Sequence, residues 1–432
     1  MFARVFDQMV PALARKVPRR YIRDIGWTIS TKVLLIPLRM VRFAFLARLL
    51  GVHQYGVFNA VSALVVFAAA FSGWGFGTLL VRHVTRDQRS FPIWWGNSLL
   101  VLIISVVPLT IFMIILGSRL LSDVTPSLII MIAGVELFHR PLGIIAERAL
   151  RARWMMTQAA LISVLPEITS VLSLMLFAAV GVRSAQNWAM WQFIGATVAT
   201  IIVVAVISSK LGKPRAQWSS IRANFLDGTH FAVGQSANSV YTSVDRVMLG
   251  RLSTFDATGI YSAALGLMNM ARLPLTSFDV VMMPRYFELG GQNVAATARF
   301  ASRNVFASLI YAVPAGVLVF LCAPFIPRFL GSDYTSAVEA IRWMAALPIF
   351  LSISNAAGLT LSAIDRPQDR TKIFAGVALV NIGLSAWLIP HYSWKGAAAS
   401  TMLSEIILGL CLSLMVWRWV QRSRRNSIDL GA

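Results

Sequence analysis

Charged residues and cysteines are scarce in this chain of 432 residues. Asp, Glu, Lys and Arg together make up only 13% of the sequence, and the two cysteines, Cys322 and Cys411, lie within or at the end of apolar segments. Two such cysteines provide neither a disulfide framework nor the spacing of a metal site. The five histidines are scattered without i, i+4 spacing, and no G-x-x-x-x-G-K-[ST] motif is present. We therefore expect no metal and no cofactor, and the sequence excludes a Walker-type ATP motor.

Acidic residues are the rarer of the two charged classes. The chain has 18 Asp and Glu against 39 Lys and Arg, a formal net charge of +21. In a soluble protein this excess would indicate a nucleic-acid partner. Here 57% of the residues are hydrophobic, the mean hydropathy is +0.69, and the basic residues gather in short connectors between long apolar runs. This distribution is typical of a multi-pass membrane protein, so no nucleic-acid partner is expected.

The apolar runs predict an all-α polytopic membrane protein with about twelve transmembrane helices. Each run has roughly the 20 residues that a helix needs to cross the hydrocarbon core. The predicted spans are 27–47, 55–80, 94–116, 127–147, 157–180, 188–209, 226–249, 257–283, 303–323, 335–362, 372–390 and 396–417.

The basic residues also predict how the chain is oriented. Alternate connectors on the side of the two termini hold 26 Lys and Arg, the opposite connectors hold 6, and 7 more lie inside the predicted spans. The positive-inside rule then places both termini in the cytoplasm. Residues 1–26 fit either a basic helix on the inner membrane surface or an irregular tail, and residues 420–432 form a basic cytoplasmic tail.

An internal repeat divides the predicted spans into two groups of six. The segment Arg48-Leu49 and the segment Gly56-Val57-Phe58 recur as Arg251-Leu252 and Gly259-Ile260-Tyr261, each offset by 203 residues. Six spans per repeat predict two pseudo-symmetric lobes, 27–209 and 226–419, joined by a basic cytoplasmic linker, 210–225. Parallel repeats of this kind usually bind substrate between them, so we expect a central cavity.

Seven cations within the spans predict that this cavity is cationic and binds an anionic substrate, because intramembrane charges usually face a bundle interior or a wet cavity. Five acidic residues are candidates for ion coupling or for ion pairs with these cations. Glu136 with Arg140 and Glu339 with Arg342 could equally be structural braces, and Arg42 could extend to the membrane surface. The predicted cationic positions are Lys32, Arg39, Arg42, Arg140, Arg246, Arg272 and Arg342, and the acidic positions are Glu136, Asp245, Asp279, Glu339 and Glu405.

Short motifs add a resemblance to a known family. Gly56-Val57-Phe58-Asn59, Asp245-Arg246-x3-Gly250, Gly259-Ile260-Tyr261 and Pro284 resemble the Wzx-like polysaccharide transporters of the multidrug/oligosaccharidyl-lipid/polysaccharide exporter superfamily. The resemblance implies a flippase, not an enzyme. Such a protein moves undecaprenyl-pyrophosphate-linked oligosaccharide, the repeat unit of O-antigen, capsule or exopolysaccharide, from the cytoplasmic to the periplasmic leaflet of a bacterial inner membrane by alternating access. A polysaccharide polymerase and chain-length machinery are the implied protein partners.

Three alternatives stay open at this point. A peptidoglycan-precursor flippase or a drug/cation antiporter of the same superfamily would share the fold. The antiporter would need an acidic cavity, whereas the cations in these spans equal or exceed the acids. The alternative of a different class is a membrane polysaccharide polymerase or ligase, which usually needs a large outward loop that is missing among these short connectors.

Overall fold

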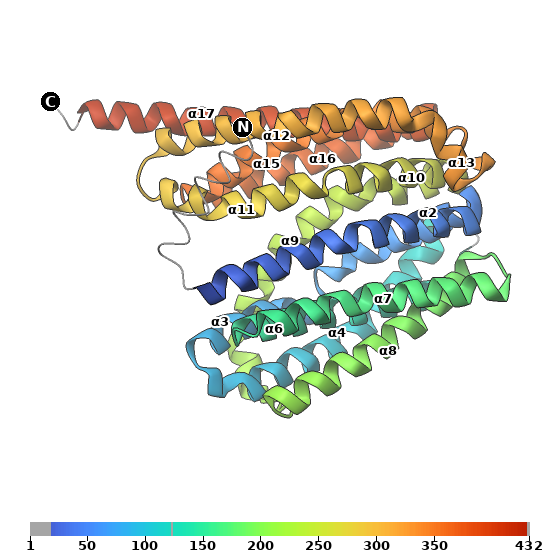
Figure 1. Ribbon diagram of the computed structural model, residues 1–432, viewed down its shortest axis with the longest axis horizontal. Coiled ribbons are helices and arrows are strands. Elements are labelled where there is room, and N and C mark those ends of the chain that lie inside the picture. The colour runs from blue at the N-terminus through green and yellow to red at the C-terminus, as the bar shows by residue number, and fades with distance from the viewer. Residues whose placement is uncertain (1–18, 122–123, 430–432) are drawn as a thin grey trace. The chain divides into compact units, whose positions relative to one another are not determined.

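The computed structural model describes the backbone of residues 19–121 and 124–429. Side chains are described from Leu35 to Ser423, apart from residues 122–123, 230–231, 233–238 and 240. Within these ranges the regular structure is entirely helical, which confirms the predicted all-α class (Figure 1). Most of the predicted N-terminal segment 1–26, the end of the predicted tail 420–432 and the side chain of Lys32 lie outside the described residues.

The helices follow one another with short connectors. In order they are α2 (Arg19–Ala69), η1 (Ser72–Gly75), α3 (Phe76–Arg86), η2 (Gln88–Ser90), α4 (Phe91–Leu120), α5 (Pro126–Ala133), η3 (Gly134–His139), α6 (Arg140–Ala152), α7 (Met156–Val180), α8 (Ala185–Leu211), α9 (Trp218–Leu252), α10 (Phe255–Ala271), α11 (Leu273–Gly290), α12 (Val294–Cys322), η4 (Ala323–Phe325), α13 (Ile326–Leu330), η5 (Ser332–Tyr334), α14 (Ala337–Met344), α15 (Leu347–Ala363), α16 (Pro367–Tyr392) and α17 (Trp394–Asp429).

Many of these helices are long and apolar enough to cross a membrane. Among the described residues eight meet this description, or nine if the bent pair Leu35–Ala69 and Ser72–Arg86 is one span. They account for most of the predicted spans, and the protein is a multi-pass membrane protein. The predicted spans 226–249 and 257–283 are also helical. Charged and polar residues lower the mean hydropathy of the first, and Arg272 divides the second into α10 and α11. The count of twelve stays a prediction.

The chain forms two compact units, and α9 belongs partly to each. The first unit ends at Ser243 and the second begins at Val244. The N-terminal part of α9 is tied to the first unit, where Trp74 Nε1 donates to Thr229 Oγ1 at 2.8 Å and Arg82 pairs with Asp227 at 3.0 Å. The predicted linker 210–225 covers the irregular residues 212–217 and the first turns of α9. Its role as the boundary between the lobes stays a prediction.

In the first unit, the first and third helical hairpins pack side by side. Arg39 contacts Glu167 and Arg42 contacts Ser170, both across 128 residues of sequence, so α2 and α7 run in the same direction (Figure 1). Further along, Gln54 Oε1 accepts a hydrogen bond from Ala185 N at 2.9 Å at the start of α8. The kink at Gly51, with φ of 70°, lets α2 turn back and supply both helices of the first hairpin.

The second unit repeats this arrangement. The side chains of Asp245 and Ser385, of Ser253 and Ser393, and of Tyr261 and Thr401 contact each other, each pair across 140 residues of sequence. The constant offset shows that the hairpin α9–α10 packs in parallel on the hairpin α16–α17. The same pairing of hairpins therefore recurs in both units, while the predicted division into lobes 27–209 and 226–419 stays a prediction.

The second predicted span of each half is interrupted at a corresponding place. In the first unit, α2 ends at Ala69 and the chain passes through Gly73, Trp74 and Gly75, all with positive φ, before α3 begins. Trp74 with φ of 45° is a strained conformation for a residue with a side chain. Its indole is held by stacking on Phe225 with ring centroids 5.5 Å apart. In the second unit the interruption falls at Arg272, between α10 and α11.

The irregular residues 212–217, which we call the strap, fix the start of α9 to the first unit. Arg215 N donates to Pro92 O at 2.8 Å and Gln217 N donates to Asn97 Oδ1 at 2.7 Å. The strap passes so close to α4 that a Cβ atom on Gly96 would lie 2.4 Å from the carbonyl carbon of Arg215. Only a glycine at this position allows the two backbones to approach in this way.

We predict that Gly96→Ala destabilises the protein, because the added methyl group would overlap the backbone of the strap. Overpacking of this kind typically costs about 1 to 3 kcal/mol. Gly143→Ala is the matched control, since a Cβ atom there meets nothing within 4 Å. Thermal unfolding in detergent should show a lower midpoint for Gly96→Ala and an equal or higher midpoint for Gly143→Ala. Equal stability of Gly96→Ala and the wild type would contradict the close contact.

Candidate functional site

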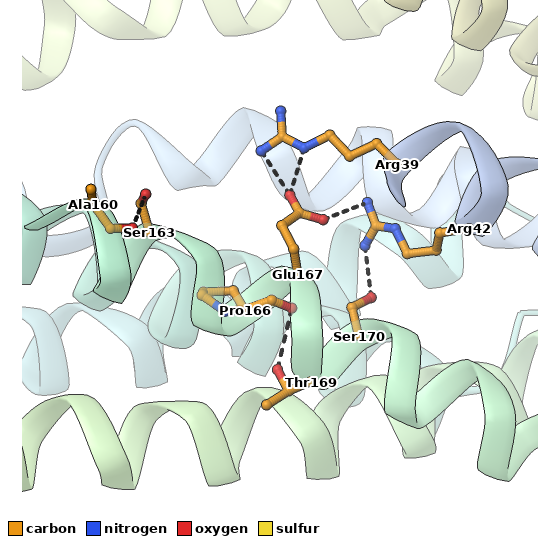
Figure 2. Close-up of polar contacts among 8 residues, drawn as sticks. All are labelled: Arg39, Arg42, Ala160, Ser163, Pro166, Glu167, Thr169 and Ser170. Atoms are coloured by element: carbon orange, nitrogen blue, oxygen red, sulfur yellow. Dashed lines mark hydrogen bonds and ion pairs between the residues drawn. The ribbon is translucent and has the colours of Figure 1, made fainter. Parts of the chain in front are cut away.

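The strongest candidate site lies between α2 and α7 in the first unit. Arg39 Nε donates to Glu167 Oε1 at 2.8 Å, and Arg39 Nη2 lies 2.8 Å from the same oxygen. Arg42 Nη2 lies 3.5 Å from Glu167 Oε2, and Arg42 Nη1 donates to Ser170 Oγ at 2.7 Å. Figure 2 shows that each guanidinium group contacts a different oxygen of the same carboxylate. Glu167 is therefore shared by two arginines.

Helical spacing places these groups opposite one another. Arg39 and Arg42 are three residues apart on α2, and Glu167 and Ser170 are three residues apart on α7, so each pair lies on one helical face. Because the helices run in parallel, the two faces meet in register. The Glu167 side chain is only 15% exposed, whereas Arg39 is 41% and Arg42 is 29% exposed. The Glu167 side chain is thus largely enclosed, whereas both arginine side chains are partly exposed.

A third arginine adds to this site. Arg140 Nη2 pairs with Glu136 Oε1 at 2.9 Å across the junction of η3 and α6, and the Arg140 side chain is 58% exposed. The turn η3, which carries Glu136, packs against α2, the helix of Arg39 and Arg42. We call Arg39, Arg42, Arg140, Glu136 and Glu167 the arginine cluster. Three guanidinium groups against two carboxylates leave one excess positive charge.

The local backbone explains how Glu136 and Arg140 meet. Residues Gly134–His139 form a π-helical turn, η3, within the fourth predicted span, and such turns often occur at functional sites. On the other side of the turn, His139 Nδ1 lies 2.8 Å from Thr200 Oγ1 on α8. The turn therefore directs Glu136 and Arg140 to each other while His139 is tied to another helix.

In the second unit, Asp245 lies at the centre of a hydrogen-bond network. Tyr261 Oη donates to Asp245 Oδ2 at 3.0 Å, Thr401 Oγ1 donates to the same oxygen at 2.9 Å, and Ser385 Oγ donates to Oδ1 at 3.0 Å. These donors come from α10, α17 and α16. Asp245 is only 6% exposed, and the three hydroxyl groups satisfy its buried carboxylate. Since they come from three helices other than α9, Asp245 joins four helices.

The other predicted positions of the second unit are spread along it. Arg272, at the break between α10 and α11, donates from Nη1 to Asn269 Oδ1 at 3.3 Å, and Asp279 accepts from Asn355 Nδ2 at 3.1 Å. Glu405 is buried with Ser354 Oγ 3.3 Å away. Arg246 is half-buried beside Asp245 on α9.

One predicted pairing is replaced by two other contacts. Glu339 and Arg342 are three residues apart on α14, but Glu339 Oε1 pairs with Lys395 Nζ at 2.8 Å. The guanidinium of Arg342 instead lies over the ring of Phe320, 5.2 Å from its centroid. Each side chain therefore contacts a residue of another helix, Glu339 one on α17 and Arg342 one on α12.

No group of three or more His, Cys, Asp or Glu side chains within the described part of the chain is arranged to hold a metal ion. The site is built from arginines, carboxylates and hydroxyl groups.

Comparisons with known proteins give the family. Residues 21–289 match the family described as "Polysaccharide biosynthesis protein", which covers more than half of the chain. The chain belongs to this family. It is also 21% identical over 398 residues, 88% of this chain and 92% of the relative, to a protein of Escherichia coli K12 named "Putative O-antigen transporter".

Solved structures show that this member of the polysaccharide biosynthesis protein family has the fold of exporter-superfamily transporters. An inward-facing multidrug resistance MATE family transporter of the MOP superfamily matches with a TM-score of 0.75 and 13% identity, over 93% of this chain and 99% of the other. The lipid II flippase MurJ, in an inward closed conformation, matches with a TM-score of 0.72 and 15% identity, over 91% of this chain and 87% of the other. At such low identity the likeness concerns the fold.

The sequence alone missed the partners that lie far away in the chain. Glu167 has no basic residue in its own span, and nothing local indicates that it joins Arg39 to Arg42. The hydroxyl donors to Asp245 are ordinary Tyr, Ser and Thr residues of other helices. One sequence signal could have indicated them. Polar residues recur with the same spacing of three in two different apolar runs, Arg39 and Arg42 in one and Glu167 and Ser170 in the other.

We predict that Arg39 and Glu167 are energetically coupled. Glu167→Gln should lower the free energy of unfolding by about 1 to 3 kcal/mol, because two guanidinium groups lose their common carboxylate. The double variant Arg39→Gln/Glu167→Gln should cost less than the sum of the single variants. Glu147→Gln is the control, since its pair with Arg151 on α6 is more exposed and should be worth less than about 1 kcal/mol. Strictly additive losses in chemical unfolding would disprove the coupling.

Proposed function

We propose that this protein is a flippase that moves undecaprenyl-pyrophosphate-linked oligosaccharide across the membrane by alternating access. The observation that supports it best is the excess positive charge of the arginine cluster within the predicted spans of the first unit. A charge in this position is expensive unless it has a partner, so an excess cation indicates an anionic substrate. The family match and the O-antigen transporter relative point to a polysaccharide building block.

Arginine is well suited to the pyrophosphate part of such a substrate. A planar guanidinium presents several N–H donors and can bind phosphate oxygens in a bidentate manner. Arg39 and Arg42 are partly exposed despite their contacts with Glu167 and Ser170, and we propose that the exposed part of each side chain meets the substrate. We assign Arg39 and Arg42 to pyrophosphate binding and Glu167 to holding them in place. Arg140, which is paired with Glu136, stays a candidate for substrate contact.

The membrane potential could drive the transport without ATP. Moving one elementary charge through 100 mV changes the free energy by about 2.3 kcal/mol. With about two negative charges on the pyrophosphate and an inside-negative potential of about 150 mV, outward movement gains roughly 7 kcal/mol. Asp279 and Glu405 remain candidates for coupling to an ion, and Asp245 is foremost a brace that joins four helices.

The proposed direction of transport follows from the distribution of basic residues. We propose that both termini are cytoplasmic, that the protein lies in the inner (plasma) membrane, and that the substrate enters from the cytoplasmic leaflet. The remaining cationic positions Lys32, Arg246, Arg272 and Arg342 stay candidates for substrate contact. A polysaccharide polymerase and chain-length machinery are the proposed partners that would use the translocated repeat unit.

Charge and the relatives argue against the alternatives. A drug/cation antiporter would need excess carboxylates, whereas the arginine cluster is cationic. A peptidoglycan-precursor flippase shares the fold and the pyrophosphate, so the glycan specificity rests on the family and on the O-antigen transporter relative. A polymerase or ligase would need catalytic groups, whereas the carboxylates of the candidate site are engaged with arginines or hydroxyl groups. We therefore propose a transporter and no enzymatic activity.

The test is flipping of a fluorescent undecaprenyl-pyrophosphate oligosaccharide in proteoliposomes under an imposed potential. We predict flipping by the wild type, and initial rates about ten- to a hundredfold lower for Arg39→Ala and Arg42→Ala, since each loses a charge-assisted hydrogen bond worth about 1.5 to 3 kcal/mol. Arg272→Ala tests the second unit in the same assay.

Arg119→Ala is the matched control, because Arg119 is exposed at the end of α4 and outside the arginine cluster. Its rate should equal that of the wild type. Flipping that survives both cluster substitutions would keep the function and refute the site. Absence of flipping by the wild type with several glycans would refute the function.

A further inference from the structure

An apolar groove lies on the surface of the second unit, and none of the charged positions described above lines it. It has a volume of about 320 Å³ and is formed by α12, α15 and α17, three of the helices that are long and apolar enough to cross a membrane. Small side chains make room for it, namely Ala295, Ala298, Ala301, Ala356 and Ala357.

The groove runs along the helices from near the start of α12 and the end of α15 toward the middle of both. Ala295 and Thr360 line it close to the ends of α12 and α15, whereas Val305 and Ile353 line it further inside. The ten residues from Ala295 to Val305 correspond to about 15 Å of helix. Because the predicted span 303–323 begins at Arg303, we expect residues 295–302 at the membrane surface and the deeper part of the groove along α15 and α17.

Among the residues that line the groove, Arg299 is the charged one, and it lies near the start of α12. Arg299 lines it one turn after the start of α12, and Trp417 lines it on α17. Arg303 follows one turn later on α12, and Arg418 follows Trp417. All three arginines are exposed, and none forms an ion pair with any residue that the structure describes.

These features match an amphiphile with an anionic head and a hydrocarbon chain. The chain would lie against the alanines, the phosphate would meet Arg299 at the membrane surface, and Trp417 would lie at the level of the headgroups, where tryptophan is favoured. Basic pockets between transmembrane helices on the cytoplasmic side are known to bind anionic lipid headgroups. This end of α12, α15 and α17 is the end with the basic connectors, which we assign to the cytoplasm.

We propose that the groove between α12, α15 and α17 is a binding site for an anionic phospholipid of the cytoplasmic leaflet, with its phosphate on Arg299. A phosphodiester carries one negative charge, which suits the single arginine that lines the groove. Arg303 and Arg418 lie next to the groove without lining it, so they add positive charge near the phosphate. The site therefore adds a lipid requirement to the protein that the proposed transport activity does not include.

Native mass spectrometry of the full chain in detergent, titrated with dioleoyl phosphatidylglycerol or dioleoyl phosphatidylcholine, tests this site. The wild type should bind phosphatidylglycerol more tightly than phosphatidylcholine. Arg299→Gln should weaken phosphatidylglycerol binding about fivefold, since one basic residue near a membrane surface contributes about 1 kcal/mol. Ala298→Leu should weaken the binding of both lipids, because the larger side chain fills the groove.

Arg328→Gln is the control, as Arg328 is an exposed arginine on α13 and does not line the groove. It should bind phosphatidylglycerol as the wild type does. If Arg299→Gln and Ala298→Leu, both monodisperse, bind phosphatidylglycerol like the wild type, the site is refuted. If the wild type does not prefer phosphatidylglycerol, the anionic headgroup is refuted. If undecaprenyl phosphate binds more tightly than phosphatidylglycerol and is lost in the same variants, the occupant is the lipid carrier and the proposal is wrong.

Discussion

The pairing of charges inside the membrane is the constraint on which the rest of this structure depends. An unpaired guanidinium in the hydrocarbon layer is costly, so Arg39 and Arg42 need a carboxylate within reach. Glu167 meets this need for both of them, with Arg39 at 2.8 Å and Arg42 at 3.5 Å. The sharing is incomplete in charge, since two cations meet one anion. It is this incompleteness that makes the site suitable for an anion, since the pair of Arg140 with Glu136 adds one charge of each sign.

The same constraint acts on the architecture of each unit. In the first unit the charged contacts link the first helical hairpin to the third, and in the second unit the contacts of Asp245 link the corresponding hairpins. Polar contacts across helices stabilise membrane proteins by a modest amount each, yet they set the register in which apolar helices pack. The first half uses ion pairs and the second uses a carboxylate surrounded by hydroxyl groups. The two halves therefore keep one packing scheme with different chemistry.

The sequence predicts the helices well and the contacts between them poorly. Hydropathy identifies the apolar helices because membrane-spanning length is a local property, and the pair of Glu136 with Arg140 follows from i, i+4 spacing. The contact of Arg39 with Glu167 spans 128 residues, so no local pattern reveals it. Glu339 shows the opposite failure, because spacing predicts Arg342 as its partner while Lys395 at the start of α17 is nearer. The positive φ of Trp74 could not be predicted either, because the sequence there shows only three glycines close together.

The two units also divide the proposed tasks by chemistry. The first unit carries the excess cations suited to a pyrophosphate. The second unit carries a buried brace and a lipid-facing groove whose single lining arginine suits a phospholipid. In both places an arginine side chain is at least partly exposed, so a bound anion could lower the free energy of placing its charge there. Family membership gives the biological context, and these exposed guanidinium groups supply the physical reason for an anionic ligand.

The most direct test of the central claim is a cryo-electron microscopy structure of the protein with bound undecaprenyl-pyrophosphate oligosaccharide. The account predicts density for the pyrophosphate within hydrogen-bond distance of Arg39 or Arg42, with Glu167 still between the two guanidinium groups. Pyrophosphate density that contacts none of Arg39, Arg42 and Arg140 would contradict it.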